Sequence, residues 1–170
     1  VMGFDISKRC YHLAYEQVET SHGAMSSRKG TIVPFLKLLQ ELESHCKNNI
    51  IKRNNNNEET TEAEIEKKAE KIALAAIRYG MIKIDPESKI IFDMDGWLKM
   101  EGNTGPYLLY TYVRMQSIID RSEGKILTSD VDWNKLKTTN ELRFLALLSQ
   151  FNDVIKDTIE KMKPNIFANY

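Results

Sequence analysis

Two glycines near the start of the chain enclose two hydroxyls and two cations, in the stretch HGAMSSRKGTIV (22–33). Glycine adopts backbone angles that other residues avoid, so Gly23 and Gly30 indicate a loop that can change shape. The hydroxyls are Ser26 and Ser27, and the cations are Arg28 and Lys29. Hydroxyl donors beside fixed positive charges are the chemistry that holds phosphate oxygens. The alternative is a polar surface turn, because Gly, Ser and charged residues are common in turns.

The other residues with catalytic or metal-binding chemistry form weaker patterns. Cys10, His12 and His22 are potential ligands, but they lack a recognised zinc spacing, and we expect no metal site. Asp93 and Asp95 lack a companion base or metal motif, and we interpret them as solvent-facing or turn residues. The sequence has no G-x-S-x-G motif that would support a hydrolase.

The overall charge of the chain attracts no particular partner. Its 170 residues carry 24 Lys and Arg against 24 Asp and Glu, so nucleic-acid binding would depend on local patches. The length suits one domain with a core, or parts of two. Cys10 and Cys46 do not form a disulfide framework and favour a reducing intracellular compartment. No apolar run approaches the roughly 20 residues of a membrane span, and no signal peptide opens the chain.

The elements that would position the loop mix strands and helices. Residues 11–19 (YHLAYEQVE) alternate in part and are rich in aromatic and branched residues, which predicts a strand followed by a turn at 20–23. Residues 31–49 have helical spacing of apolar positions, with Pro34 near the first turn. The Asn-rich tract 54–57 is interpreted as a surface loop or insertion.

A capping box of Thr61 and Glu64 predicts the start of a long helix. One face of this helix carries small and branched residues, which indicates close packing against a neighbour. These residues are Ile65, Ala69, Ile72, Ala73, Ala76, Ile77 and Gly80. We interpret the charged residues of 62–71 as a solvated face.

The second half of the chain begins with a predicted turn at Asp85-Pro86 and a short strand at 90–92. A helix is predicted to begin at Pro106, a loop at 124–133, and further helices from a second capping box at Thr138 and Glu141 onward. Pro164 suits the first residue of a last helix. We therefore expect mixed α/β structure in 1–103 and only helices in 104–170, with a domain boundary near 100–106.

Two stretches resemble one known family. The stretch AMSSRKGTIV (24–33) is similar to the KMSKS signature loop of class I aminoacyl-tRNA synthetases, in its arginyl-type variant. The stretch FDMDGWLKMEGNTGPYLLYTYVRMQSI (92–118) resembles a long pattern of the arginyl-tRNA synthetases, and residues 13–19 and 69–84 fit as well. The resemblance to the arginyl-tRNA synthetases covers nearly the whole chain except the Asn-rich tract.

This resemblance implies a fold and a reaction. The fold would be the C-terminal part of a Rossmann-type catalytic domain (1–103), followed by the first helices of an α-helical anticodon-binding domain (104–170). In the reaction, arginine and ATP form arginyl-adenylate and pyrophosphate, and the arginine then passes to the 3′ end of tRNA(Arg). ATP would be a substrate accompanied by Mg²⁺, with no tightly bound cofactor. The expected partners are tRNA(Arg), ATP, L-arginine and the remainder of a longer polypeptide, without a membrane, in the cytoplasm or alternatively an organelle.

The resemblance also assigns roles in the first loop. Ala24 stands where the family has its first lysine, and Ser27 stands where it has the second, which is usually the main cation on the phosphates. Because Ser27 departs from that pattern, we expect Arg28 and Lys29 to act as the catalytic cations, or else a lysine elsewhere in the parent protein. The expected ATP-binding residues are Met25, Ser26, Ser27 and Gly30.

The second stretch is expected to contact tRNA, because in this family it lies where the anticodon arm docks. The expected tRNA-binding residues are Glu101, Gly102, Asn103, Thr104, Tyr107 and Tyr110. Tyrosine rings stack on unpaired bases, which is how single-stranded RNA is usually recognised. Packing in a core or between domains is the competing, and commoner, explanation for Tyr107, Tyr110 and Tyr112 on one helix.

Parts of the family's active site are absent from the sequence. It contains no H-x-G-H motif, and the family's arginine-recognising carboxylates lie upstream of these residues. Both ends fall within patterned sequence, so we expect a piece of a longer protein that is inactive alone. The alternative is a non-catalytic tRNA-binding or assembly module derived from a synthetase. The intact MSSRKG stretch argues against it, because a module selected only for binding needs no phosphate loop.

Overall fold

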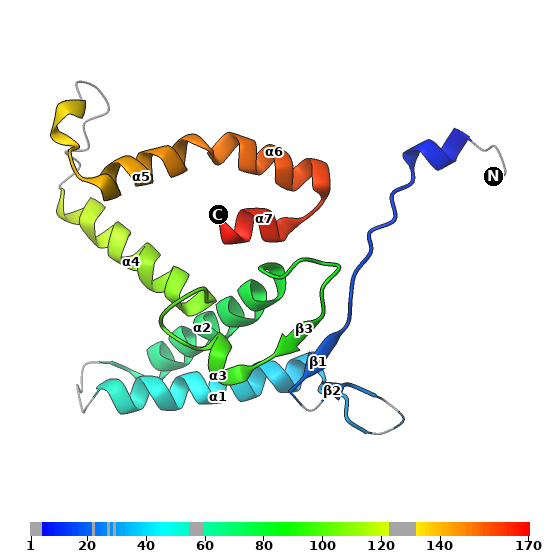
Figure 1. Ribbon diagram of the computed structural model, residues 1–170. Helices are drawn as coiled ribbons and strands as arrows, with labels where there is room; N and C mark the ends of the chain where they lie inside the picture. The colour runs from blue at the N-terminus through cyan, green and yellow to red at the C-terminus, as the bar shows by residue number, and fades with distance from the viewer. Residues whose placement is uncertain (1–4, 22, 27, 29, 55–59, 123–131) are drawn as a thin grey trace.

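The chain forms a pair of packed helices with a small sheet beside them (Figure 1). A second set of helices follows, which extends away from this helix pair and then turns back toward it. The computed structural model describes residues 5–21, 23–26, 28, 30–54, 60–122 and 132–170. The described part is mostly helical with one three-stranded sheet. None of its helices is long and apolar enough to cross a bilayer.

The sheet consists of three very short strands. β1 (Val18–Thr20) lies between β2 (Gly23–Ala24), which runs antiparallel to it, and β3 (Ile90–Phe92), which runs parallel to it. In register, Glu19 faces Ala24 on one side and Ile91 on the other. The strand at 90–92 and the turn at Asp85 are confirmed, the latter by a 2.9 Å hydrogen bond from Ser88 N to Asp85 O.

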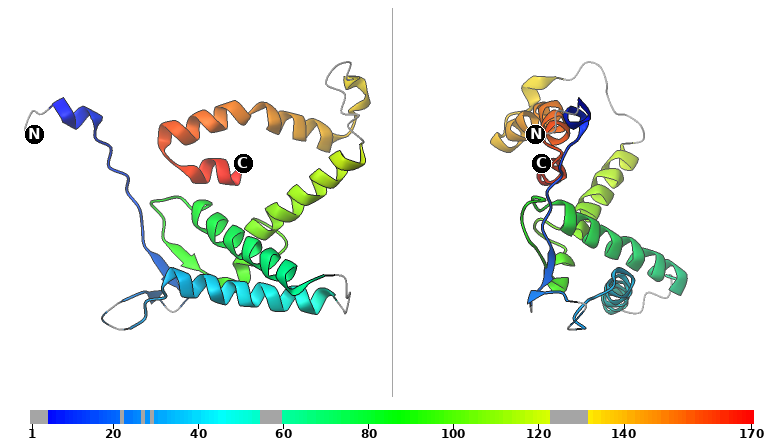
Figure 2. Two further views of the ribbon diagram at one scale, coloured as in Figure 1. Left: turned by 180° about the vertical axis from the view of Figure 1, so that it is seen from behind. Right: turned by 90° about the vertical axis from the view of Figure 1, so that its right-hand side faces the viewer.

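The predicted strand at 11–19 is wrong over most of its length. A short 3-10 helix, η1 (Asp5–Arg9), precedes it, and residues 10–17 form no regular element. This segment runs away from the sheet as an extended chain (Figures 1 and 2), and Tyr15 is 83% exposed. A strand needs a hydrogen-bonded neighbour. Along 10–17 the described residues supply two backbone hydrogen bonds, both next to β1: Glu16 N donates to Pro86 O at 2.8 Å, and Ile90 N donates to Gln17 O at 3.2 Å.

The core lies between α1 (Phe35–Asn54) and α2 (Glu62–Ile82). The predicted capping box of Thr61 and Glu64 is present at the start of α2, and Pro34 directly precedes α1. The face predicted from small and branched residues is buried at Ala69, Ala73, Ala76, Ile77 and Gly80 and half-buried at Ile65 and Ile72. Of the Asn-rich tract, Asn54 ends α1, and 55–57 lie outside the described residues.

Glycines allow two elements to approach α2 closely. α3 (Met94–Trp97) places the Trp97 ring so that a Cβ on Gly80 would lie 2.4 Å from it. α4 (Gly105–Arg121) begins so close to α2 that a Cβ on Gly105 would lie 2.1 Å from the backbone oxygen of Ala75. The small residues of α2 therefore allow close contacts with both α3 and α4.

The remainder of the described chain is helical, as predicted for 104–170. After α4 come η2 (Trp133–Lys135), α5 (Thr139–Ser149), α6 (Phe151–Lys161) and α7 (Pro164–Asn169). The capping box at Thr138 and the helix start at Pro164 are confirmed. Of the predicted loop at 124–133, residues 124–131 lie outside the described residues, and Trp133 belongs to η2, so the loop prediction is wrong at its last residue. α4 leads away from α2. The next two helices, α5 and α6, run back, and α7 returns to α2 (Figure 2).

Candidate functional site

The loop after β2 is closed at its base by hydrogen bonds. Ser26 N donates to Thr31 Oγ1 at 2.9 Å, and Thr31 N donates to Ser26 O at 3.0 Å. Gly23 and Gly30 have φ angles of +105° and +66°, in the left-handed region that favours glycine. Gly30 lies in the loop, as the sequence predicted, whereas Gly23 is the first residue of β2. A Cβ at either position would meet no atom within 4 Å, so glycine is favoured by backbone conformation and not by lack of space.

The described part of this loop presents one cation to solvent. Arg28 is exposed, Met25 and Ser26 are half-buried, and the bonds at the base of the loop use Ser26 through its backbone. The predictions for Ser27, Lys29 and His22 concern positions outside the described residues. An exposed guanidinium on a projecting loop can approach a polyanion without first breaking a contact in the described part of the protein.

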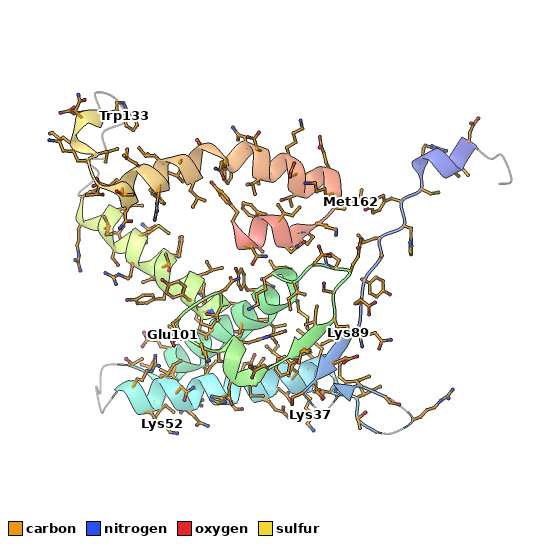
Figure 3. All side chains as sticks on the ribbon, viewed as in Figure 1. Lys37, Lys52, Lys89, Glu101, Trp133 and Met162 are labelled. Atoms are coloured by element: carbon orange, nitrogen blue, oxygen red, sulfur yellow. The ribbon has the colours of Figure 1, made fainter. Side chains whose placement is uncertain are left out.

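The loop between α3 and α4 combines buried and exposed groups. Thr104 is 7% exposed and caps α4: its hydroxyl donates to Lys99 O at 2.6 Å and accepts from Tyr107 N at 3.3 Å. The Asn103 side-chain oxygen accepts from the Tyr79 hydroxyl. Glu101 and Gly102, at φ +72°, are exposed (Figure 3, where Glu101 is labelled). Asn103 and Thr104 thus hold the loop in place, whereas Glu101 and Gly102 face solvent.

The tyrosines of α4 form a partly exposed aromatic row. The rings of Tyr107 and Tyr110 are stacked with centroids 6.3 Å apart, and the two residues are 40% and 43% exposed. Arg114 extends the row, because its Nη1 donates to the Tyr110 hydroxyl at 2.9 Å. Sequence reasoning missed Arg114, although its spacing of four residues from Tyr110 on a helix was visible. Within the described residues, these rings are not core residues.

The structure does not bring the two predicted groups of site residues together. The loop after β2 projects on one side of the sheet, and α4 leads away on the other (Figure 1). Beside the second group, a groove of about 380 Å³ separates α1 from the loop at 98–101, with Arg53, Lys99, Asp95 and Glu101 among its lining residues. Its charges are of both signs, so it selects no polyanion.

The weaker candidates form no catalytic or metal centre among the described residues. No group of three or more His, Cys, Asp or Glu side chains is arranged there to hold a metal. Asp93 occupies the N-cap position of α3 and Asp95 its first turn, and both are exposed, as predicted. Burial raises the pKa of the Cys46 thiol to about 11, so this cysteine is protonated and unreactive at neutral pH.

Comparison with known proteins identifies relatives along the whole chain. An arginine–tRNA ligase of Bdellovibrio bacteriovorus is 38% identical over all 170 residues, and one of Pyrococcus furiosus is 36% identical over 98% of the chain. The chain is a homologue of the arginine–tRNA ligases. The resemblance to that family is thereby confirmed. The chain spans 29% and 27% of the lengths of these two ligases.

Structure and domain matches agree with this relationship to the arginine–tRNA ligases. The solved structure of Thermus thermophilus arginyl-tRNA synthetase superposes with a TM-score of 0.78 at 27% identity, covering 97% of this chain and 26% of that one. Residues 108–170 match the DALR anticodon binding domain. This match begins inside α4, whereas the sequence predicted a boundary at 103–104, and that boundary stays a prediction.

Proposed function

We propose that the protein carrying this chain is an arginine–tRNA ligase. It activates arginine with ATP to arginyl-adenylate and pyrophosphate, and it then transfers the arginine to tRNA(Arg). The observation that carries the proposal is 38% identity, along the whole chain, to a protein named for this activity. In this proposal, 1–103 end a Rossmann-type class I catalytic domain and 104–170 begin the anticodon-binding domain, and the protein works in the cytoplasm or, alternatively, an organelle.

The loop after β2 would act on the phosphates of ATP, which is a substrate accompanied by Mg²⁺. Adenylate formation is an in-line attack on the α-phosphate, and negative charge grows on the departing pyrophosphate. Cations directed at that charge lower the barrier more than they tighten ATP binding. We assign this role to Arg28 and Lys29, and contacts with bound ATP to Met25, Ser26, Ser27 and Gly30. The exposure of Arg28 and the positive φ angles of Gly23 and Gly30 support the assignment.

The α3–α4 loop and the first turns of α4 would bind tRNA. Tyr107 and Tyr110 offer partly exposed rings on which unpaired bases can stack. Glu101 and Gly102 are exposed beside them, and Asn103 and Thr104 keep the loop in position. The domain match over 108–170 supports this role.

Kinetics of loop variants in the full-length protein test the proposal. A hydrogen bond to a charged group contributes about 1.5–3 kcal/mol, so Arg28→Ala or Lys29→Ala should lower kcat for ATP–pyrophosphate exchange roughly 10- to 150-fold. KM for ATP should move less, because the loop engages after the nucleotide binds. Lys156→Ala, which removes a 70%-exposed lysine side chain on α6, is the matched control. Near-normal kcat in both loop variants would refute the cationic role.

Exchange and tRNA-binding assays of the wild-type protein distinguish a ligase from the alternative, a non-catalytic module. A non-catalytic module derived from a synthetase would bind tRNA but would form no arginyl-adenylate under any condition. Exchange that requires arginine and rises above a catalyst-free blank favours the ligase. Specific tRNA binding without exchange favours the module.

A further inference from the structure

Four polar side chains join the end of α2, the α3–α4 loop and α7, and we call them the clasp: Tyr79, Lys83, Asn103 and Asn169. The hydroxyl of Tyr79 is shared between the Asn103 side-chain oxygen and Ala168 O, the latter at 2.8 Å. Asn103 Nδ2 donates to Asn169 Oδ1 at 2.9 Å, and Asn169 Nδ2 donates to Lys83 O at 2.7 Å. Lys83 Nζ completes the clasp by donating to Asn103 O at 2.8 Å.

The clasp joins segments that are far apart in the sequence. Its bonds connect residues separated by 20 to 89 positions, and the two partners of each bond belong to different segments. Tyr79 is buried, and burial raises its pKa, so its hydroxyl remains a donor well above neutral pH. Beside the clasp, Lys163 forms an ion pair with Asp85 at 3.0 Å, which also ties the start of α7 to the turn after α2.

The position of the clasp gives the second set of helices two attachments to α2. The first is the start of α4, where Gly105 lies against the backbone of Ala75. The second is α7, which returns to α2 after the excursion through α5 and α6 (Figure 2). With one attachment, α4 to α7 could pivot about the α2–α4 contact. With two, the direction of α4 relative to α1 and the sheet is fixed.

We propose that the clasp is a positioning device for tRNA: it holds α4, the helix that carries Tyr107 and Tyr110, at a fixed angle to the part that carries the loop after β2. This inference rests on the proposed function. A tRNA that contacts both parts binds as a bivalent ligand, and its affinity depends on the effective concentration of the second contact once the first has formed. A loosened angle lowers that effective concentration and leaves each separate contact unchanged.

The inference predicts a selective loss of affinity in the full-length protein. Tyr79→Phe removes the shared hydroxyl and keeps the ring, and Asn169→Ala removes the amide that links Asn103 to Lys83. Each should weaken binding of whole tRNA(Arg) about tenfold. Binding of the isolated anticodon stem-loop of the same tRNA should stay within about twofold of wild type, because this probe contacts one part only.

A control variant and a double-mutant cycle complete the test. Asn152→Ala makes the same substitution at an exposed position of α6 outside the clasp, and it should change neither affinity. In the double variant of Tyr79→Phe and Asn169→Ala, the fold-loss of affinity for whole tRNA(Arg) should be smaller than the product of the two single fold-losses, because both side chains act through Asn103.

Three results would overturn the inference: unchanged affinity of both single variants for whole tRNA, an equal loss for the stem-loop, or losses that multiply. If Asn169→Ala does not fold, Tyr79→Phe alone decides, since its packing ring is retained. Absence of selective tRNA(Arg) binding or charging by the wild-type protein would instead count against the proposed function.

Discussion

Replacing Gly105 with alanine tests whether the close approach of α4 to α2 holds the junction together. Gly105 is the first residue of α4 and is buried. An added Cβ would lie 2.1 Å from Ala75 O and 2.9 Å from Ala76 N. Ordinary contact begins at 3.4 Å, so the shortfall to the oxygen is 3.4 − 2.1 = 1.3 Å. Both obstacles are backbone atoms of a packed helix, which cannot rotate away.

The expected cost follows from this geometry. The two helices must separate by about 1 Å, and overpacking of this kind costs about 1–3 kcal/mol. We take the upper end because the obstacle is rigid. Alanine's better helix propensity returns at most about 1 kcal/mol. The net loss at the junction is therefore about 2 kcal/mol, which corresponds to a roughly 30-fold larger open population.

Hydrogen exchange in the full-length protein measures this opening locally. We expect amides in the first turns of α4 to exchange about 30-fold faster in Gly105→Ala than in wild type. Gly96→Ala is the matched control, because its Cβ would meet the Asp93 side chain at 2.3 Å, and a carboxylate can rotate away. Exchange at α4 within twofold of wild type in Gly105→Ala would refute the reasoning.

Two further predictions concern the helices after α4. Tyr107→Ala or Tyr110→Ala should weaken tRNA binding by about 1–3 kcal/mol per stacked base and leave ATP binding unchanged; normal tRNA binding with a lowered Tm would favour packing instead. The Lys163 ammonium holds the pKa of Asp85 below 3.8, and Asp85 raises the pKa of Lys163 above 10.5. The stabilisation by this pair is thus complete between these two values, is lost as pH falls through the lowered pKa of Asp85, and is lost as pH rises through the raised pKa of Lys163. Exchange at α7, corrected for its intrinsic rate, should accelerate in acid in wild type and not in Asp85→Asn; equal acceleration in both would exclude the pair.

Elements with local sequence signals were predictable. The capping boxes at Thr61 and Thr138 each bring two side chains three residues apart, so their partners are visible in the sequence. The starts of α4, one residue before Pro106, and of α7, at Pro164, reflect the fixed φ of proline. The buried face of α2 follows from helical periodicity alone.

The strand predicted at 11–19, which forms only from Val18 onward, shows where such signals fail. Aromatic and branched residues favour an extended backbone, and the segment is extended. A strand also requires a neighbouring backbone, and no local pattern states whether one is present. β1 forms only where Glu19 meets Ala24 and Ile91, and Ile91 is far along the chain.

The residues of the candidate site likewise include some that local sequence signals predict and some that they do not. That Gly23 and Gly30 mark a loop was predictable, because glycine's tolerance of positive φ is a local property. The role of Asn103 was not, because its side-chain partners Tyr79 and Asn169 lie 24 and 66 residues away. Arg114 was within reach, since a contact four residues apart on a helix is local.

The hydrogen bonds of Asn103 determine how substitutions in this region are interpreted. Its side-chain oxygen, its amide and its backbone carbonyl are all engaged by other residues of the protein. Loss of tRNA binding on substitution of Asn103 would therefore not identify an RNA contact, whereas the same loss at Tyr107, whose ring is partly exposed, would. Whole tRNA and the isolated stem-loop separate the two cases, because a stacking residue affects both probes and a positioning residue affects only the one that spans both parts.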